Sequence, residues 1–264
     1  MSIKIIKELG ILVGIFLIIW IVFIYVPMRP KAPEAAISLE QEQKIGEVLI
    51  DYYLENVTLV TDSTITSAVD QIYDRLLQGL ETTEYDYRLY IIKNDNINAF
   101  ASLGGNIVIF TGLIDYAESP EEVAAVLAHE IGHVEKRHVV NKVVKELGVG
   151  LVLSIITGGS DAGFLGQILQ QSVSTVFDRG QESEADDYGL ALLENARIHP
   201  NSMAVIFRKI RDRYSSSTME TLEFLSTHPN TNKRIKKSLE YKTSEGFQSQ
   251  PFTNIDWTEV RSAL

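Results

Sequence analysis

The spacing of apolar residues predicts a mainly helical chain with a short β section in its first half. Apolar positions three and four apart predict amphipathic helices over residues 38–55 and 64–80, and the first begins with a capping box, Ser38-x-x-Gln41. Runs rich in β-branched and aromatic residues then predict strands. These strands are expected at residues 87–92, 98–103 and 106–111, the last two on either side of Gly104-Gly105. Together they indicate a small, mostly antiparallel sheet.

Helical spacing returns after the β section. A helical turn is expected at 113–117, and Ser119-Pro120-Glu121-Glu122 is a strong start for one long helix within 119–146. Further helices are expected at residues 164–177, 180–196, 200–214, 218–226 and 230–241. The pattern therefore indicates an α+β fold that is mainly helical.

One uncharged run precedes the amphipathic pattern. Residues 9–26 are 18 consecutive residues without a charge, and as a helix they reach about 27 Å, close to the thickness of the hydrocarbon core of a bilayer. The alternative is a cleaved signal peptide, whose apolar region is usually shorter and precedes a small-residue cleavage site. Here the run ends in Tyr25 and Pro27 instead. We therefore expect one transmembrane anchor, with a flank at 1–8 and a proline-containing linker at 27–37.

The remaining residues are expected to form one domain over 38–241, followed by a loose polar tail over 242–264. Within this domain, residues 147–159 form an apolar, glycine-containing stretch. A helix of this length reaches only about 20 Å and is too short to span a bilayer. The stretch is either a buried connection or a lid or membrane-touching hairpin.

Composition excludes several kinds of site. The net charge is −11 and the pI is about 5.0, and no basic stripe provides the electrostatic footprint of a nucleic-acid-binding surface. The chain has no cysteine, which excludes disulfides and cysteine-ligated zinc. Nothing in the sequence indicates an oligomeric state.

The long predicted helix contains an H-E-x-x-H motif, His129-Glu130-Ile131-Gly132-His133. Residues four apart share one helical face, so His129 and His133 can direct both imidazoles toward one point. Glu130 can reach a water held at that point. This is the arrangement of two zinc ligands and a general base. The alternative is a helix with two surface histidines, unless a third ligand exists.

An acidic stretch about 50 residues downstream offers that ligand. Glu182 and Asp186 are four residues apart and share a helical face. One carboxylate can bind a metal, while the other accepts an N–H from a ligating imidazole and fixes its tautomer. The alternative is a solvated helix start, where acidic residues complement the helix dipole. The upstream motif favours the metal site.

These motifs resemble those of the HtpX/BepA-like zinc endopeptidases, a superfamily that includes the CAAX prenyl proteases and the mitochondrial OMA-type protease. The matching stretches occur in the family's order at Glu40–Gly46, Asn98–Leu113, His129–His133, Arg179–Gly189 and Thr227–Ile235. The family's many-span members differ from this chain, which has one convincing span, so the single-anchor BepA/OMA-like branch is nearest. The resemblance implies a zincin-type metallopeptidase domain around a central H-E-x-x-H helix.

Carried over by position, the resemblance implies one Zn²⁺ per chain, held by His129, His133 and Glu182, with Glu130 as the general base. It implies that Asp186 orients His129. Glu184 is a rival to Glu182, but it lies about 200° around the helix from it, so the two cannot face the same metal.

Three further residues receive roles from the resemblance or from their neighbourhood. His228, in a His-Pro pair, is expected either to stabilise the oxyanion or to occupy the open zinc position in a latent enzyme. Arg179 and Arg234 are expected as ion-pair partners near the site. His138 lies five residues after His133 and about 140° off its face, so it is expected not to be a ligand.

The sequence is compatible with two functions. The first is a membrane-anchored zinc endopeptidase that acts on misfolded or membrane-associated proteins. An extended polypeptide substrate would pair with the strand containing Asn98, Ala99, Phe100 and Ala101. The second is a membrane-tethered chaperone or assembly factor whose zinc site is latent or structural.

The expected location is the cell (inner) membrane. The chain is expected to cross the lipid bilayer once, through 9–26. A slight excess of positive charge before the anchor, together with the resemblance, favours an extracytoplasmic or periplasmic catalytic domain.

Overall fold

The structure is a computed structural model that describes residues 37–264, apart from residues 160, 174–175, 217–223, 225–227 and 229–230. The predicted anchor at 9–26 and the linker at 27–37 lie outside these residues, except for Ile37. Within the described part of the chain, no helix combines the length and the apolar character needed to cross a membrane. The expected helix at 218–226 also falls almost entirely outside it.

Capping side chains determine where helices α2 and α3 begin. Helix α2 spans Leu39–Leu54, and the side chains of Ser38 and Gln41 form the expected capping box. Helix α3 spans Ser63–Gln78, and Asp62 caps it by accepting hydrogen bonds from two backbone N–H groups. The apolar faces of both helices contribute to the main hydrophobic core.

In the part of the chain that the structure describes, three strands form one small mixed sheet in the order β1-β3-β2. The strands are β1 (Arg88–Ile92), β2 (Ala99–Ala101) and β3 (Asn106–Phe110). Strand β3 is antiparallel to β2 but parallel to β1, so the expectation of a mostly antiparallel sheet is wrong. The glycine turn predicts only the antiparallel β2–β3 hairpin. The parallel pairing of β1 with β3 depends on the route of the chain between the two strands, and no local sequence pattern predicts that route.

The turn between β2 and β3 depends on its two glycines. Gly104 and Gly105 have φ angles of 75° and 85°, a region that residues with a Cβ rarely adopt. A short 3-10 helix, η1 (Leu103–Gly105), occupies this turn. Strand β3 is buried along its whole length, which fits its central position.

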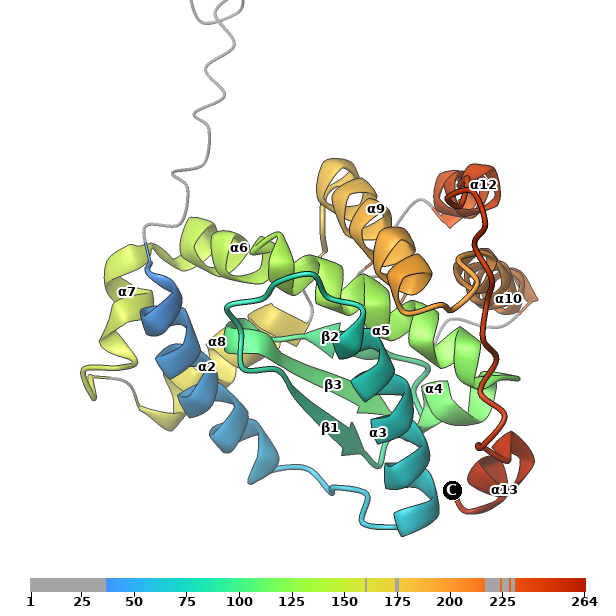
Figure 1. The fold of residues 1–264 in the computed structure, drawn as a ribbon. Coiled ribbons are helices and arrows are strands. Elements are labelled where there is room, and N and C mark those ends of the chain that lie inside the picture. The colour runs from blue at the N-terminus through green and yellow to red at the C-terminus, as the bar shows by residue number, and fades with distance from the viewer. Residues whose placement is uncertain (1–36, 160, 174–175, 217–223, 225–227, 229–230) are drawn as a thin grey trace, which may run out of the picture. The chain divides into compact units, whose positions relative to one another are not determined.

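Helix α5, Pro120–Glu135, lies at the centre of the domain (Figure 1). Ser119 caps it and Pro120 occupies its first turn, as expected. Every residue from Glu122 to Val134 is buried. Strands β2 and β3 and helix α3 pack against α5, as do α9 (Arg179–Asn195) and α10 (Asn201–Ser216). The H-E-x-x-H turn is therefore held on all sides.

The expected single helix within 119–146 is wrong, because it breaks after α5. Arg137 adopts φ 55°, and a separate helix, α6 (His138–Leu147), begins at the next residue. The Arg137 guanidinium donates hydrogen bonds to the Glu42 carboxylate and to the carbonyl oxygen of Ile37. These distant partners offset the strain of a left-handed non-glycine residue.

The apolar stretch at 147–159 begins as a helical connection. Helix α7, Val149–Ser154, buries Val152, while the neighbouring Leu151 is 52% exposed. Three further helices of the described chain are α4 (Thr111–Tyr116), α8 (Ala162–Val173) and α12 (Thr231–Glu240). The burial of Val152 fits a packed connection, and the possible role of the stretch as a lid stays a prediction.

The expectation of a loose tail is wrong for the end of the chain. Residues Trp257–Ser262 form helix α13, which packs near α3. Trp257 is only 8% exposed, and its indole N–H donates a 2.9 Å hydrogen bond to the carbonyl oxygen of Ala117. One aromatic anchor therefore attaches a polar segment to the core.

Candidate metal centre

Helix α5 directs three motif side chains into the interior of the domain. His129, Glu130 and His133 are fully buried. The Nε2 atoms of the two histidines lie 3.1 Å apart, as expected for residues separated by one helical turn. The alternative of two surface histidines is therefore excluded.

Helix α9 brings Glu182 to the same point. Its Oε1 lies 3.3 Å from His133 Nε2, and its Oε2 lies 3.8 Å from His129 Nε2. Helices α5 and α9 approach this closely because Gly132 has no side chain. A Cβ at Gly132 would lie 2.7 Å from the carbonyl oxygen of Ala185 on α9.

His228 adds a fourth donor from a separate segment. Its Nδ1 lies 3.2 Å from His129 Nε2 and 2.9 Å from Glu182 Oε1. One donor atom from each of His129, His133, Glu182 and His228 lies within 4.8 Å of the others. This buried set of nitrogen and oxygen donors can hold a single metal ion, and we call it the donor group.

Glu130 borders the donor group without belonging to it. Its Oε2 accepts a 2.9 Å hydrogen bond from the backbone N–H of Ala101. Its Oε1 has no hydrogen-bond partner among the described residues and lies 3.6 Å from His228 Nε2. Burial raises the pKa of Glu130 to about 7, against a smaller opposing effect of His228. A carboxylate with one oxygen held and the other open is suited to proton transfer near neutral pH.

Burial also keeps two of the histidines neutral. It lowers the pKa of His129 to about 4, and it lowers the pKa of His133 well below its ordinary value. Neutral imidazole is the form that binds a metal. Burial opposes protonation of His228 as well, but the carboxylates of Glu182 and Glu130 outweigh it and raise the pKa of that histidine.

Asp186 and Arg234 lie directly behind the donor group. Asp186 Oδ1 is 3.0 Å from His129 Nδ1, the ring nitrogen that faces away from the other donors. Arg234 donates through Nε and Nη2 to the Asp186 carboxylate, and its Nη1 lies 2.7 Å from Glu182 Oε2. Burial disfavours the Asp186 carboxylate, but Arg234 and His129 outweigh it and lower its pKa to about 2. Asp186 therefore stays ionised.

The other predicted residues are more loosely connected to the centre. Arg179 is exposed in the first turn of α9, where it lines a pocket of about 180 Å³ together with Glu182 and Asp186. No ion pair of Arg179 is found among the described residues, so the role expected for it stays a prediction. Glu184 does not face the donor group and lies 3.2 Å from His138.

The predicted substrate strand is buried. Asn98, Ala99, Phe100 and Ala101 are each at most 5% exposed, and helices α5 and α8 pack against β2. The Phe100 ring packs edge-on against Tyr53 and Phe110. The N–H of Ala101 is already used by Glu130. Pairing of this strand with a substrate stays a prediction.

The sequence pattern gave no indication of one aromatic contact. The Phe177 ring stacks on the His133 imidazole, with centroids 3.8 Å apart and planes at 25°. Phe177 is 5% exposed and lies just before the acidic stretch, where no periodicity distinguishes it. It covers one face of a donor-group histidine and limits its movement.

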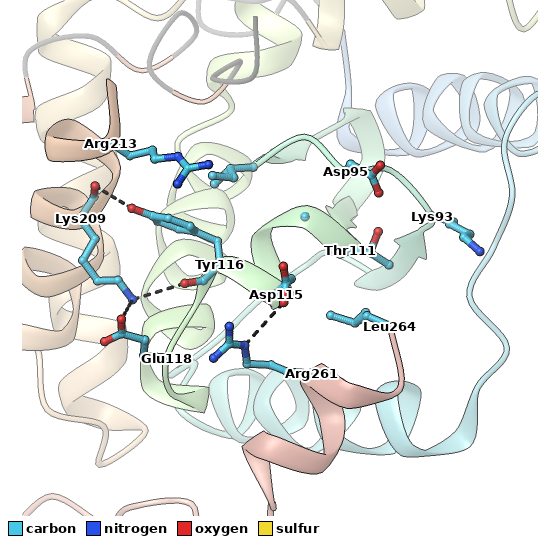
Figure 2. A pocket seen from close by; sticks show the side chains of 12 residues that line it. Lys93, Asp95, Thr111, Asp115, Tyr116, Glu118, Lys209, Arg213, Arg261 and Leu264 are labelled. Carbon is cyan, nitrogen blue, oxygen red and sulfur yellow. Dashed lines mark hydrogen bonds and ion pairs between the residues drawn. The ribbon is translucent and has the colours of Figure 1, made fainter. Parts of the chain in front are cut away.

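A wider cavity lies elsewhere. Figure 2 shows a cavity that is lined by none of the donor-group residues. Its volume is about 690 Å³. Two pairs of its charged side chains lie close together, Lys209 and Glu118 at 3.3 Å and Arg261 and Asp115 at 3.6 Å.

Comparison with known proteins supports the interpretation that this chain is a metallopeptidase. Residues 64–242 match the family model of peptidase family M48. The chain is 30% identical over 214 residues to a beta-barrel assembly-enhancing protease of Yersinia pestis, an alignment that covers 76% of this chain and 44% of that protein. It is 28% identical over 225 residues to the mitochondrial metalloendopeptidase OMA1 of Schizosaccharomyces pombe, covering 82% and 66%.

A third relative is the metalloprotease LoiP of Escherichia coli, 35% identical over 155 residues and covering 56% of this chain and 60% of that protein. The chain spans less than half the length of the beta-barrel assembly-enhancing proteases that it matches. The matched region 64–242 includes the whole donor group and Glu130. The expected BepA/OMA-like resemblance is thereby confirmed, and the chain belongs to peptidase family M48.

Proposed function

We propose that this chain is a zinc-dependent endopeptidase that hydrolyses peptide bonds in misfolded or membrane-associated proteins. The observation that carries the proposal is the position of Glu130. Its Oε1, which has no hydrogen-bond partner among the described residues, borders the buried donor group, while its Oε2 accepts a hydrogen bond from the backbone N–H of Ala101. A site that only held a metal would have no use for a buried carboxylate in that position.

The donor spacing fits zinc. Four ligands at about 2.0–2.1 Å around a tetrahedral Zn²⁺ are separated by about 3.3 Å. The closest donor distances in the group are 3.1, 3.2, 3.3 and 2.9 Å. Imidazole and carboxylate are also ligands that zinc accepts in catalytic sites. We therefore assign one zinc ion to His129, His133 and Glu182, with His228 as a fourth donor at rest.

When bound, zinc would supply Lewis acidity that makes a nearby water more acidic and polarises a peptide carbonyl. Glu130 Oε1 accepts the proton of the attacking water. The same oxygen then delivers that proton to the amine of the leaving fragment. The hydrogen bond from Ala101 to Oε2 keeps the carboxylate oriented through both transfers.

Four protein donors form a closed set, whereas a catalytic zinc keeps one position open. His228 is the donor that is suited to leave. It comes from a segment of its own, whereas His129 and His133 are fixed on α5 and Glu182 is fixed on α9. We propose that the resting enzyme is latent and that His228 withdraws when substrate enters.

We also propose that residues 9–26 anchor the chain in the cell (inner) membrane, with the domain on the extracytoplasmic side. The support is the uncharged run and the charge pattern around it. The substrate class is supported by the names of two relatives, one a beta-barrel assembly-enhancing protease and the other a mitochondrial metalloendopeptidase.

One observation favours a second function. The closed donor group is also the arrangement of a structural zinc site. In that case the chain would be a membrane-tethered chaperone or assembly factor, and His228 would be a permanent ligand. The presence of Glu130 beside the group favours the peptidase.

The test uses the full chain purified in detergent, with unfolded casein as substrate. We expect zinc in the wild-type protein, and we expect cleavage that a chelator abolishes and added zinc restores. Glu130→Gln should retain zinc and lose cleavage, whereas the exposed control Glu84→Gln should behave like the wild type. Full activity of the Glu130→Gln variant would contradict the proposed mechanism.

Two further variants separate the functions. Glu182→Ala should lose zinc. His228→Ala should keep zinc and cleave casein faster if His228 blocks a catalytic site. Loss of zinc from His228→Ala, with no cleavage by any variant, would instead indicate the structural site.

A further inference from the structure

A second histidine lies behind one of the donor-group histidines. His138, in the first turn of α6, is 3% exposed. Its Nδ1 lies 3.0 Å from Nδ1 of His133, the ring nitrogen that faces away from the other donors. Its Nε2 lies 3.2 Å from Oε2 of Glu184 on α9. The three side chains form a continuous chain, His133–His138–Glu184.

The helix break at Arg137 makes this chain possible. On one continuous helix, a residue five positions after His133 would lie about 140° from its face. The left-handed conformation of Arg137 redirects the backbone and places His138 beside His133. Glu184 lies about 200° around α9 from Glu182 and so cannot join the donor group. It reaches the centre only through His138.

Hydrogen-bond chemistry then assigns the protons. When His133 binds a metal through Nε2, that nitrogen must keep its lone pair, so the ring proton lies on Nδ1. His133 Nδ1–H therefore donates to His138 Nδ1. His138 must carry its own proton on Nε2, which donates to the Glu184 carboxylate. Each nitrogen in the chain has one role, and no donor faces another donor.

The two histidines of the motif are thus supported in parallel ways. His129 Nδ1 faces the Asp186 carboxylate directly, at 3.0 Å. His133 Nδ1 faces a carboxylate through one intervening imidazole. Both carboxylates come from α9, the helix that also supplies Glu182.

We propose that His138 is a positioning residue for the metal site, which holds His133 in its metal-binding tautomer and orientation through a hydrogen bond that Glu184 completes. The proposal rests on the proposed zinc site but not on peptidase activity. It explains why a buried histidine that cannot be a ligand lies beside one. It also gives a role to the exposed Glu184, which the catalytic mechanism does not use.

The experiment measures zinc affinity of the full-length protein in detergent, by competition with a chromogenic chelator. Loss of a partner behind a metal ligand typically weakens binding by about 10–100-fold, and we expect His138→Leu to fall in this range. His138→Asn keeps an acceptor at the Nδ1 position and should recover most of the affinity. Glu184→Ala should weaken zinc binding less than His138→Leu does.

A double variant tests whether the two residues act together. Because both act through one chain, His138→Leu with Glu184→Ala should be no weaker than His138→Leu alone. The matched controls are His199→Leu and Glu84→Ala, which change an exposed histidine and an exposed glutamate outside the centre. Urea unfolding of each variant without metal checks that the fold is intact. The exposure of Glu184 makes its alanine variant informative even if a change at His138 unfolds the protein.

The outcomes are separable. A wild-type chain that binds no zinc refutes the proposed function itself. A wild-type chain that binds zinc, with His138→Leu and Glu184→Ala binding it equally tightly, overturns only the positioning role. The positioning role is also overturned if His138→Leu weakens zinc binding, His138→Asn does not restore it and Glu184→Ala has no effect. His138 would then act by packing alone.

Discussion

The substitution Glu130→Gln should make the metal-free protein more stable at alkaline pH, although it should abolish the activity of the metal-bound protein. Burial raises the pKa of Glu130 from its ordinary value of 4.5 to about 7. A carboxyl group with a raised pKa binds its proton more tightly in the folded chain than in the unfolded chain. Ionising Glu130 therefore costs folding stability, and this cost develops as the pH rises from about 4.5 to about 7 and is complete above that value.

The size of the effect follows from the shift. One pKa unit corresponds to about 1.4 kcal/mol, so the rise to about 7 predicts a cost of about 3 kcal/mol above neutral pH. Glutamine has nearly the same shape and no charge, and its amide oxygen can still accept the hydrogen bond from Ala101. Below about pH 4.5 the wild-type side chain is neutral as well, so the two proteins should be nearly equally stable there.

The assay is urea unfolding of both proteins at about pH 5 and about pH 9, with metal removed by a chelator because a bound cation would stabilise the carboxylate. We expect the difference in the free energy of unfolding to be small at the lower pH and to favour the variant at the higher pH. The exposed substitution Glu84→Gln is the control and should show no such dependence. A Glu130→Gln protein that is less stable than the wild type at alkaline pH, or a difference independent of pH, would refute the reasoning.

Three other substitutions test the contacts of Arg234, Asp186 and Trp257. Arg234→Ala should lower the free energy of unfolding by about 3–5 kcal/mol in urea, because it leaves the buried carboxylates of Asp186 and Glu182 without their cation; an unchanged midpoint would contradict this. Asp186→Asn should weaken zinc binding by about 10–100-fold in a chelator competition. The lowered pKa of Asp186, about 2, adds stability above its unfolded pKa, so the wild type should lose stability relative to this variant as the pH falls from about 4 to about 2. Trp257→Ala should cost about 3–5 kcal/mol in the same urea assay, whereas a detached tail would give no change.

The parts of the fold that could be predicted depend on neighbours in the sequence. The capping box at Ser38 and the start of α5 at Ser119 involve residues within one helical turn, so the pattern identifies them. The same holds for the donor spacing, because His129 and His133 share a face by helical geometry alone. Helical spacing identified Glu182 and Asp186 as a candidate pair, whereas the resemblance made Glu182 the ligand and added His228, which no spacing rule connects to the H-E-x-x-H helix.

The parts that could not be predicted depend on distant partners. Arg137 is an ordinary residue in its sequence context, and its left-handed backbone is stabilised by Glu42 and Ile37 from the start of the domain. The docking of Trp257 depends on a carbonyl group 140 residues earlier in the chain. A local pattern carries no information about such contacts, and propensity alone favours a continued helix and a loose tail.

The helix break at Arg137, which the local sequence does not predict, also affects the chemistry of the site. Helical periodicity predicts that His138 is not a ligand, and it also makes His138 appear unrelated to the centre. The break removes that periodicity between α5 and α6 and brings His138 within 3.0 Å of His133. The strain at Arg137 is offset by bonds to Glu42 and Ile37, neither of which touches the donor group. Contacts at the start of the domain therefore determine which side chain lies next to His133. If His133 binds zinc as proposed, substitution of Glu42 should weaken zinc binding although Glu42 lies outside the site.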